Sequence, residues 1–462
     1  MSPATRLIAG IVVLVVGLVA SVLGGTPSVV LRQGFDGPSE VQGCLSRRYN
    51  PPDPGIAVGL NHAIVTVNSR IFVYRIRPIQ VITPVSQQSL DDFFGAGLCD
   101  GQPPSDLFDP HCVWDHYLNR FIVVAIAPGS PYIWIAVSTS SDPTLGWTVK
   151  QYQNTVADGV DYPGVGYDDV NWYVTVNLSA NLGALICAFK KSEFPGANPY
   201  TQVVSDGESI MPAMAWYPDP SDPAHPNFGY FMEAFRDAVT GDTSIRLHVW
   251  DNIGNGYYDD PTKNPFVFPF SAWVDPFPDL DLEQCEGRVR DERYQHAAEL
   301  RNCVYQVGKL YSAHAPLMQG REQARWIEVQ VNGWPAVGTP NPGMTDGYLT
   351  SDYLTFMPAI ARNRNPAGHL GMVVATAEVG TPPGIGVFGG LAEPTISWTP
   401  LVNVKTGLCA TDPPSPIWGD FFEIAVDPVD GSFWIIGEYW KLNDTGQEIW
   451  GTWIQNFRVV VQ

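Results

Sequence analysis

A short run of small and apolar residues recurs along this chain, and it restricts the possible folds more than any other feature of the sequence. The runs begin at Asp53, Asp109, Tyr162, Met211, Gln295, Met357 and Phe421, at intervals of 49 to 84 residues. Five of the seven runs carry Pro at their second position. A repeat on this scale predicts a structure built from similar units, each stabilised by packing on its neighbours.

Each run is followed by a turn and by two segments with the character of β-strands. After the first run these segments are HAIVTVN and RIFVYRI, and a fourth strand can be read in most repeats, as in PIQVITP, WTVKQYQ and PFVFPF. Small residues suit a first strand that lines a narrow axis, whereas aromatic residues fill the space between units. Four-stranded antiparallel units repeated around an axis form a β-propeller. The sequence therefore predicts an all-β fold, a seven-bladed β-propeller of four-stranded antiparallel blades.

The two ends of the chain predict how the ring is closed. The last repeat ends at Gln462 after its third strand, so the sequence holds no fourth strand for it. The segment PSVVLRQGF, residues 27–35, precedes the first repeat and has strand character. We predict that this N-terminal strand completes the last blade and covers its exposed edge.

The N-terminal region predicts export. Arg6 precedes an apolar stretch from Leu7 to Leu23, so residues 1–25 resemble a secretory signal peptide, with an uncleaved membrane anchor as the alternative. Residues 26–49 are then the closing strand and linker, and residues 50–462 the propeller, with a long insert at about 251–291. The expected location is extracellular, on the cell surface or periplasmic, with membrane contact only through an uncleaved N-terminal segment.

Charge and cysteine content narrow the expected partners. The net charge of −21 disfavours nucleic acid and leaves a glycan or protein ligand. No resident cofactor is expected, although calcium stays open as a cation for an acidic chain. The sequence has seven cysteines and no Cys-x-x-Cys motif. Because export permits disulfides, we predict one between Cys285 and Cys303.

Several segments carry a resemblance to a known group. The segments PPDPGIAVGLNHAIVTVNSRIFVY (51–74) and WGDFFEIAVDPVDGSFWIIGEYW (418–440), with a stretched Asp-box from Ser140 to Trp147, resemble secreted bacterial seven-bladed β-propeller proteins related to the sialidase-like (BNR/Asp-box) superfamily. The resemblance implies the fold. A sialidase also needs an arginine trio, a Tyr with a partner Glu and an acidic proton donor, but no spacing ties Arg236, Arg293 and Arg301 together.

The repeat itself gives a geometric prediction of the binding site. In a propeller, the loops that lead into the first strands meet the ends of the second strands on one face, around the axis. The candidate binding residues at these positions are Asp53, Asp109, Asp161, Arg293, His314, Asp420 and Glu438. The alternative is that these acidic residues cap turns and bond to the backbone of neighbouring blades. No catalytic or metal-binding residue is predicted, and the ligand-rich stretch DPHCVWDH is interpreted as scaffold, with only Asp109 as a site residue.

Two functions follow from these observations. The first is an exported, non-enzymatic recognition or cell-surface interaction protein with a ligand site on the axial face, because a full repeat is present and no catalytic motif is found. The alternative is a glycoside hydrolase or lyase, sialidase-like, that uses axial carboxylates.

Overall fold

The computed structural model describes residues 25–40, 51–80, 83–95, 107–216, 227–237, 240, 242–269, 282–284, 287–289, 299–318, 321–364, 368–378, 381–408 and 421–462. Within these ranges the chain is nearly all β, and α1 (Leu90–Phe94) is the one α-helix. No helix in this described part is long and apolar enough to cross a membrane. Residues 1–24, almost the whole of the predicted signal peptide or anchor, lie outside it.

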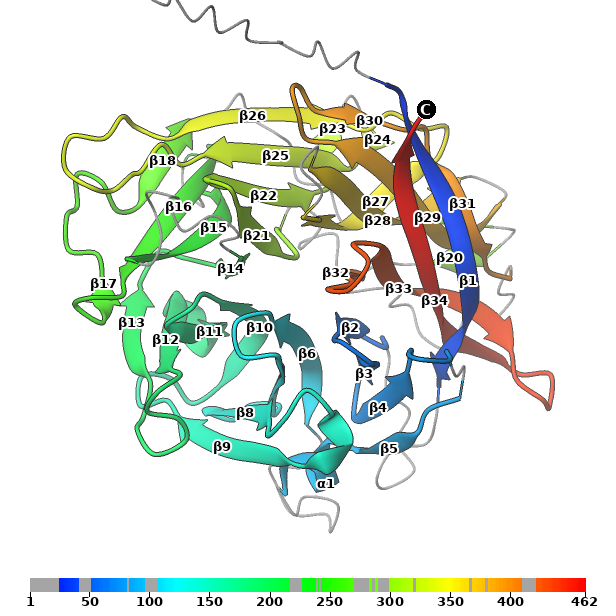
Figure 1. The fold of residues 1–462 in the computed structure, drawn as a ribbon, viewed down its shortest axis with the longest axis horizontal. Coiled ribbons are helices and arrows are strands. Elements are labelled where there is room, and N and C mark those ends of the chain that lie inside the picture. Colours follow the sequence, from blue (N-terminus) through cyan, green and yellow to red (C-terminus); the bar gives the residue numbers. More distant parts are fainter. Residues whose placement is uncertain are drawn as a thin grey trace, which may run out of the picture.

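The strands pair antiparallel with their neighbours in sequence, and each group starts with its inner strand (Figure 1). The first groups are β2 (Gly55–Val58), β3 (His62–Val67), β4 (Arg70–Arg75) and β5 (Ser86–Ser89); β6 (Phe108–Asp115), β7 (Arg120–Ile126), β8 (Tyr132–Ser138) and β9 (Trp147–Gln153); and β10 (Val160–Tyr167), β11 (Asn171–Leu178), β12 (Ala184–Lys190) and β13 (Tyr200–Val204). A further group is β14 (Met211–Ala215), β15 (Phe228–Arg236) and β16 (Thr243–Asp251), with β17 (Gly256–Tyr257) and β18 (Phe266–Pro269) both paired to β16.

The second half of the chain continues the pattern. Its groups are β21 (Cys303–Gln306), β22 (Lys309–His314), β25 (Arg325–Gln330) and β26 (Gly343–Tyr348); β27 (Leu354–Arg362), β28 (His369–Glu378) and β29 (Thr381–Leu391), with β30 (Ser397–Trp398) and β31 (Val402–Thr406); and β32 (Glu423–Val426), β33 (Phe433–Leu442) and β34 (Glu448–Val461), joined by β1 (Pro27–Ser39). Two small hairpins are β19 (Leu282–Gln284) with β20 (Gly287–Val289), and β23 (Leu317–Met318) with β24 (Arg321–Glu322).

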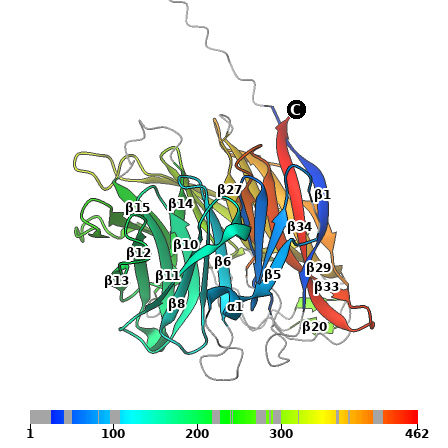
Figure 2. The same ribbon diagram turned by 60° about the horizontal axis from the view of Figure 1, so that its bottom comes forward.

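The groups are arranged around a common centre, with inner strands such as β2, β6, β10 and β32 nearest to it and β9, β13 and β26 on the outside (Figure 1). Figure 2 shows the same sheets standing side by side. Neighbouring inner strands run parallel, and short bridges join β10 to β14 and β14 to β21. We call the end where the inner strands begin the entrance end, and the end where they finish the exit end.

The N-terminal strand pairs with the last group, as the sequence predicted. β1 runs antiparallel to β34, from Pro27 opposite Val461 to Ser39 opposite Gly451. A buried hydroxyl at Thr452 donates to the carbonyl oxygen of Pro38 at 2.7 Å. The outer edge of the β32–β34 sheet is therefore covered by a segment from the other end of the chain.

Small residues in the inner strands have a packing reason. A Cβ atom on Gly166 of β10 would lie 2.6 Å from the carbonyl oxygen of Ala213 in β14, closer than real Cβ contacts allow. Larger apolar side chains, such as Val165 and Trp172, instead fill the space toward Ile122 and Val124 of the preceding group. The sequence pattern of small inner strands and bulky outer ones thus follows from the crowding at the centre.

The structure corrects three details. The fourth strand of the first group is β5 rather than PIQVITP, because β4 pairs with β5 from Arg70 opposite Ser89 to Val73 opposite Ser86. The prolines of PIQVITP cannot donate to a ladder. The inner strand expected at Gln295–Leu300 is β21, which begins at Cys303 and pairs with Ala213 of β14. The disulfide guessed for Cys303 is wrong, because this buried thiol is free.

Candidate functional site

The repeated prolines mark a sharp bend at the entrance end. Asp53, Asp109, Tyr162 and Met357 each precede Pro and have φ between 42° and 52°, a region that side-chain-bearing residues rarely adopt. At the last three of these positions the pairing with the second strand shifts register, as at a β-bulge. The bend turns the incoming loop into the inner strand and holds the residue before Pro at the rim of the axis.

Second-strand ends meet these loops, in the arrangement that the sequence predicted. The amide nitrogen of Asn68 donates to the carboxylate of Asp53 and to the carbonyl oxygen of Pro51 (2.8 Å), and its oxygen accepts from the backbone N–H of Asp109 (2.8 Å). Asn177 likewise accepts from the backbone N–H of Ser209 at 2.7 Å. These side chains link neighbouring groups, so at least part of their role is the structural one.

A buried arginine occupies the axis at the entrance end. The guanidinium of Arg301, in a residue only 2% exposed, donates to the hydroxyl of Tyr162 at 2.6 Å and contacts the sulfur of Met357 at 3.2 Å. Its Nη1 lies 4.0 Å from a carboxylate oxygen of Glu299, and it lies over the ring of Phe421 at 5.3 Å. We call Tyr162, Glu299, Arg301, Met357 and Phe421 the axial entrance cluster.

Burial controls the protonation of this cluster. The pKa of the Tyr162 hydroxyl is raised well above its ordinary value, first by burial and despite the neighbouring Arg301, so the phenol is neutral. His111 packs edge-on against Phe421, with ring centroids 4.6 Å apart. Burial, helped by Arg301, lowers the pKa of His111 to about 4, and its buried Nε2 has no hydrogen-bond partner among the described residues.

The predicted site residues lie in different places. Asp53 and Asp109 come together through Asn68 at the entrance end. Asp161 is exposed and lies opposite Asn177 in the β10–β11 ladder, and its carboxylate accepts from the backbone N–H of the adjacent Tyr162 at 3.0 Å.

His314 is buried at the end of β22, with its Nε2 3.2 Å from Nη1 of Arg325. Glu438 is buried but does not end its strand as expected, because β33 continues to Leu442 and pairs Glu438 with Thr452 of β34. Arg293 and Asp420 lie outside the described residues.

Sequence reasoning missed the role of Arg301 and Glu299 because it placed the fifth inner strand too early. With β21 starting at Cys303, the residues that lead into it are Glu299, Leu300 and Arg301 rather than Arg293. The signal that could have found them is the short apolar run CVYQ, which lies directly before the turn at Val307 and Gly308 and the second strand β22.

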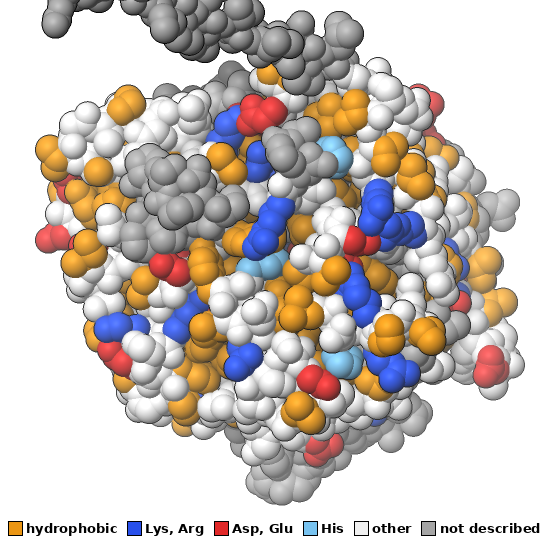
Figure 3. Space-filling view, in the orientation of Figure 1, with side chains coloured by type: hydrophobic (Ala, Val, Ile, Leu, Met, Phe, Trp, Pro, Cys, Tyr) orange, Lys and Arg blue, Asp and Glu red, His pale blue; other side chains and the backbone are white. Residues whose placement is uncertain are grey.

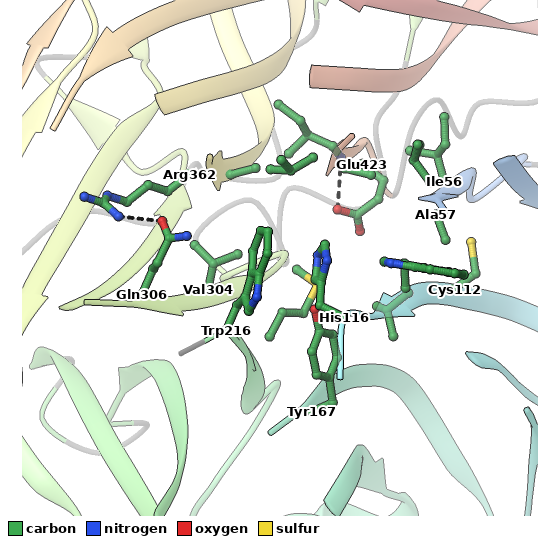
Figure 4. A pocket seen from close by; sticks show the side chains of 18 of the residues that line it. Ile56, Ala57, Cys112, His116, Tyr167, Trp216, Val304, Gln306, Arg362 and Glu423 are labelled. Carbon is green, nitrogen blue, oxygen red and sulfur yellow. Dashed lines mark hydrogen bonds between the residues drawn. The ribbon is translucent and has the colours of Figure 1, made fainter. Parts of the chain in front are cut away.

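Below the entrance cluster the inner strands enclose a cavity of about 70 Å³ (Figure 4). Its lining includes Ile56, Cys112, Tyr167, Val304, Arg362 and Glu423. A single water needs roughly 10–15 Å³ on this measure. The cavity therefore has room for several waters or a small ligand.

Glu423 is the acidic group of this cavity. Its Oε1 accepts from the backbone N–H of Ile424 at 2.9 Å and from the amide of Asn302 at 3.4 Å. Burial nevertheless dominates and raises the pKa of Glu423 to about 8. The carboxyl group is therefore mostly protonated at neutral pH.

Three flat groups cover the cavity at the exit end. His116 and Trp216 stack with ring centroids 3.9 Å apart and planes inclined by 4°, and the guanidinium carbon of Arg364 lies 2.9 Å from the centre of the Trp216 ring. Burial, with Arg364, lowers the pKa of His116 to about 3. Figure 3 looks onto this end, where Lys and Arg side chains surround the centre. We call His116, Trp216 and Arg364 the exit stack.

Metal binding was a possibility left open for calcium. Among the described residues, no group of three or more His, Cys, Asp or Glu side chains is placed to hold a metal ion. The ligand-rich stretch DPHCVWDH spreads its acidic residues along β6. Asp109 lies at the entrance end, whereas the carboxylate of Asp115, at the other end of β6, binds the ammonium of Lys191 at 2.5 Å.

The chain was compared with known proteins. No family model matches it, and no curated protein is similar to it. Among solved structures, it is similar to a subtype N11 neuraminidase-like protein of A/flat-faced bat/Peru/033/2010, with 10% identity, a TM-score of 0.39 and coverage of 93% of this chain and 94% of that chain. It is also similar to the GH43 endo-arabinanase from Bacillus licheniformis (13% identity, TM-score 0.30, 65% of this chain and 94% of that chain).

A mutant of the Synechocystis apocarotenoid oxygenase gives a TM-score of 0.39 at 10% identity, over 79% of this chain and 80% of that chain. The printed names cover different activities and the TM-scores are low. These similarities therefore assign neither a family nor an activity to this chain.

Proposed function

We propose that this chain is an exported recognition protein that binds a carbohydrate at the entrance end of its axis. In this proposal the strand groups are the seven blades of a β-propeller, closed by β1, and residues 1–25 direct export. The antiparallel groups with parallel inner strands and the pairing of β1 with β34 support the architecture. Location and ligand follow from the sequence and from the chemistry of the entrance end.

The observation that carries the proposal is the axial entrance cluster. It combines a buried guanidinium, a hydroxyl, a carboxylate and two aromatic rings within one small region of the axis. Sites for small polar ligands are typically apolar surfaces with a few fixed polar groups, and aromatic rings with hydrogen-bonding side chains are suited to sugars. The acidic residues at the rim, Asp53 and Asp109, add acceptors for hydroxyl groups.

A glycan array with the full-length chain tests this function. The wild type is expected to bind a restricted set of glycans, and Tyr162→Phe is expected to weaken that binding about tenfold or more, because the hydroxyl that orients Arg301 is lost. Tyr152→Phe is the matched control, since Tyr152 is a half-buried tyrosine in the outer strand β9. Absence of any glycan ligand, or equal loss in both variants, would overturn the proposal.

A second candidate, glycoside hydrolysis, is favoured by one specific contact. The Tyr162 hydroxyl lies beside both Glu299 and Arg301, so a hydroxyl, a carboxylate and a guanidinium occur together. This is part of the residue set that the sialidase-like alternative requires. A panel of fluorogenic aryl glycosides, including a sialoside, tests it: turnover that falls about a hundredfold or more in Glu299→Gln supports an enzyme. Binding without turnover leaves the recognition function.

A further inference from the structure

Hairpin loops at the exit end carry exposed aliphatic side chains. In the last group and the first two groups these residues are Ile79, Val85, Leu118, Leu145 and Val429, each between 45% and 73% exposed. They lie in loops that join a first strand to a second or a third strand to a fourth, and antiparallel pairing places those loops at the exit end. We call these five residues the exit rim. Exposed apolar side chains at one end of a protein are typical of an interaction surface.

Arginine side chains lie beside the exit rim. Arg75 is the exposed last residue of β4, and Arg120 begins β7 directly after the loop that holds Leu118. Arg120 donates to the carbonyl oxygens of Leu118 and Asn119 at 3.2 Å, which keeps its guanidinium in this loop. Figure 3 shows Lys and Arg side chains among apolar ones over this end. Aliphatic groups that enter acyl chains and guanidinium groups that bind phosphate are together suited to a lipid surface.

The chain enters the described structure at this same end. Pro27 of β1 lies opposite Val461 of β34, and the backbone N–H of Gln462 donates to the carbonyl oxygen of Thr26 at 3.1 Å. Because β34 is a third strand and finishes at the exit end, β1 begins there, beside the C-terminus marked in Figure 2. The N-terminal region is therefore joined to the molecule at the exit end.

The apolar stretch of the N-terminal region lies close to this point in the sequence. Leu7 to Leu23 is 17 residues long, at the lower end of the range for a membrane span. Only residues 24–26 separate it from Pro27. Four residue steps of about 3.5 Å reach about 14 Å at most. A membrane that held this stretch would therefore lie against the exit end.

We propose that residues 7–23 stay in the membrane as an anchor and that the exit rim rests on the surface of the bilayer beside it. The aliphatic side chains of the rim enter the headgroup region, and Arg75 and Arg120 bind lipid phosphate. The net charge of −21 would repel the free molecule from an anionic surface, so the short tether, rather than charge, brings the rim to the lipid. The entrance end then faces away from the membrane. This proposal does not depend on the carbohydrate ligand.

Fluorescence quenching in vesicles tests this orientation. The full-length chain is reconstituted into phosphatidylcholine vesicles that contain a nitroxide-labelled lipid, and an environment-sensitive fluorophore is attached at Leu145→Cys. Val156→Cys is the matched control, because Val156 is an exposed aliphatic residue in the β9–β10 loop at the entrance end. The exit-rim label is expected to be quenched several-fold more than the entrance label. Cys112, Cys187 and Cys303 are buried, and the chain without an introduced cysteine gives the background.

A second comparison separates the contribution of the rim from that of the tether. Ile79→Ser, Leu118→Ser and Val429→Ser together should reduce the quenching of the Leu145→Cys label to about half or less, because polar loop tips no longer enter the headgroup region. Val156→Ser, at the entrance end, should leave the quenching unchanged. Quenching that survives the three rim substitutions would show that the tether alone holds the exit end near the lipid, and contact by the rim would be overturned.

Other results would overturn the proposal as a whole. Equal quenching of the two labels would show that the exit end does not face the bilayer. The mass of the intact chain recovered from exporting cells tests the anchor, because a chain that lacks residues 1–25 would show that the apolar stretch is removed. A full-length chain that does not stay with the vesicles would contradict the anchor in the same way. A negative glycan array would leave all of these measurements unaffected.

Discussion

One position of the repeated run accounts for the chemistry of the axis. The third residue of the run is small in most repeats, as in Gly55, Gly164 and Ala359, but it is His111 in the second and Glu423 in the last. Small residues are needed where the inner strands crowd together. The two exceptions place titratable groups in that crowded space. Burial lowers the pKa of His111 and raises the pKa of Glu423, so both side chains favour their neutral forms.

Glu423 should make stability depend on pH. Its pKa is raised to about 8 in the folded state, whereas an unfolded Glu has a pKa of about 4.3. The folded state therefore holds the proton more tightly, and the free energy of unfolding falls as pH rises from the unfolded pKa to the folded one. The free energy of unfolding of Glu423→Gln, relative to that of the wild type at the same pH, should rise by roughly 2–5 kcal/mol between pH 4 and pH 9.

Urea denaturation of both proteins at each pH measures this difference. Comparing the two proteins at the same pH removes the contributions of His111 and His116, which the variant retains. A difference between the proteins that does not vary with pH would show that Glu423 titrates normally in the folded state.

At the scale of the element, the bend at the entrance end is a repeated device. The proline of the bend can be read from the sequence. The positive φ of the residue before it depends on the loop, the second strand and the neighbouring group together. The fifth group lacks this proline, and there the sequence placed the inner strand too early. The strand was expected too early because Ala297, Ala298 and Leu300 have the small and apolar character of the run.

The asparagines that hydrogen-bond neighbouring groups together should differ in how much they stabilise the protein. Asn68→Ala removes three hydrogen bonds at a buried site, including the one that holds the backbone of Asp109, and should destabilise the protein by about 2–4 kcal/mol. Asn177→Ala, at the half-buried equivalent position in β11, should have a smaller effect of about 1 kcal/mol. Urea denaturation measures both. Equal losses of stability in the two variants would mean that burial does not determine how much these hydrogen bonds contribute.

β1 should be required for the stability of the whole sheet to which it belongs. Deleting residues 27–36 exposes the edge of β34 and removes the pairing from Pro27 to Asp36, so the melting temperature should fall by about 10 °C or more. Val30→Thr, at a residue 46% exposed on the same strand, is the control and should change little. Scanning calorimetry measures both, and an unchanged melting temperature after the deletion would contradict the role of β1.

At the scale of the whole molecule, the axis is a stack of three layers. The axial entrance cluster joins Tyr162 to Arg301 and Phe421, and the exit stack joins His116 to Trp216 and Arg364. Between them lies the cavity with Glu423. Each layer takes its members from groups that are far apart in the sequence, so none of the three layers exists until the groups are assembled around the centre.

Net charge should limit the stability of the assembled molecule. A charge of −21 on 462 residues implies self-repulsion that salt screens. The melting temperature should rise by a few degrees when sodium gluconate is increased from about 10 mM to about 200 mM. A melting temperature that is constant or falls with salt would show that local ion pairs outweigh the overall repulsion.

The sequence by itself determined the strand content, the order of the strands and the pairing of the N-terminal segment with the last group, because hydrophobic alternation and repeat spacing are local properties of the chain. It also located the ends of the second strands beside the loops at the entrance end. Only the tertiary structure decided which side chains meet on the axis. Arg301, Tyr162 and Glu423 are ordinary residues in the sequence, and their contacts and their protonation depend on burial among groups that the sequence separates by more than a hundred residues.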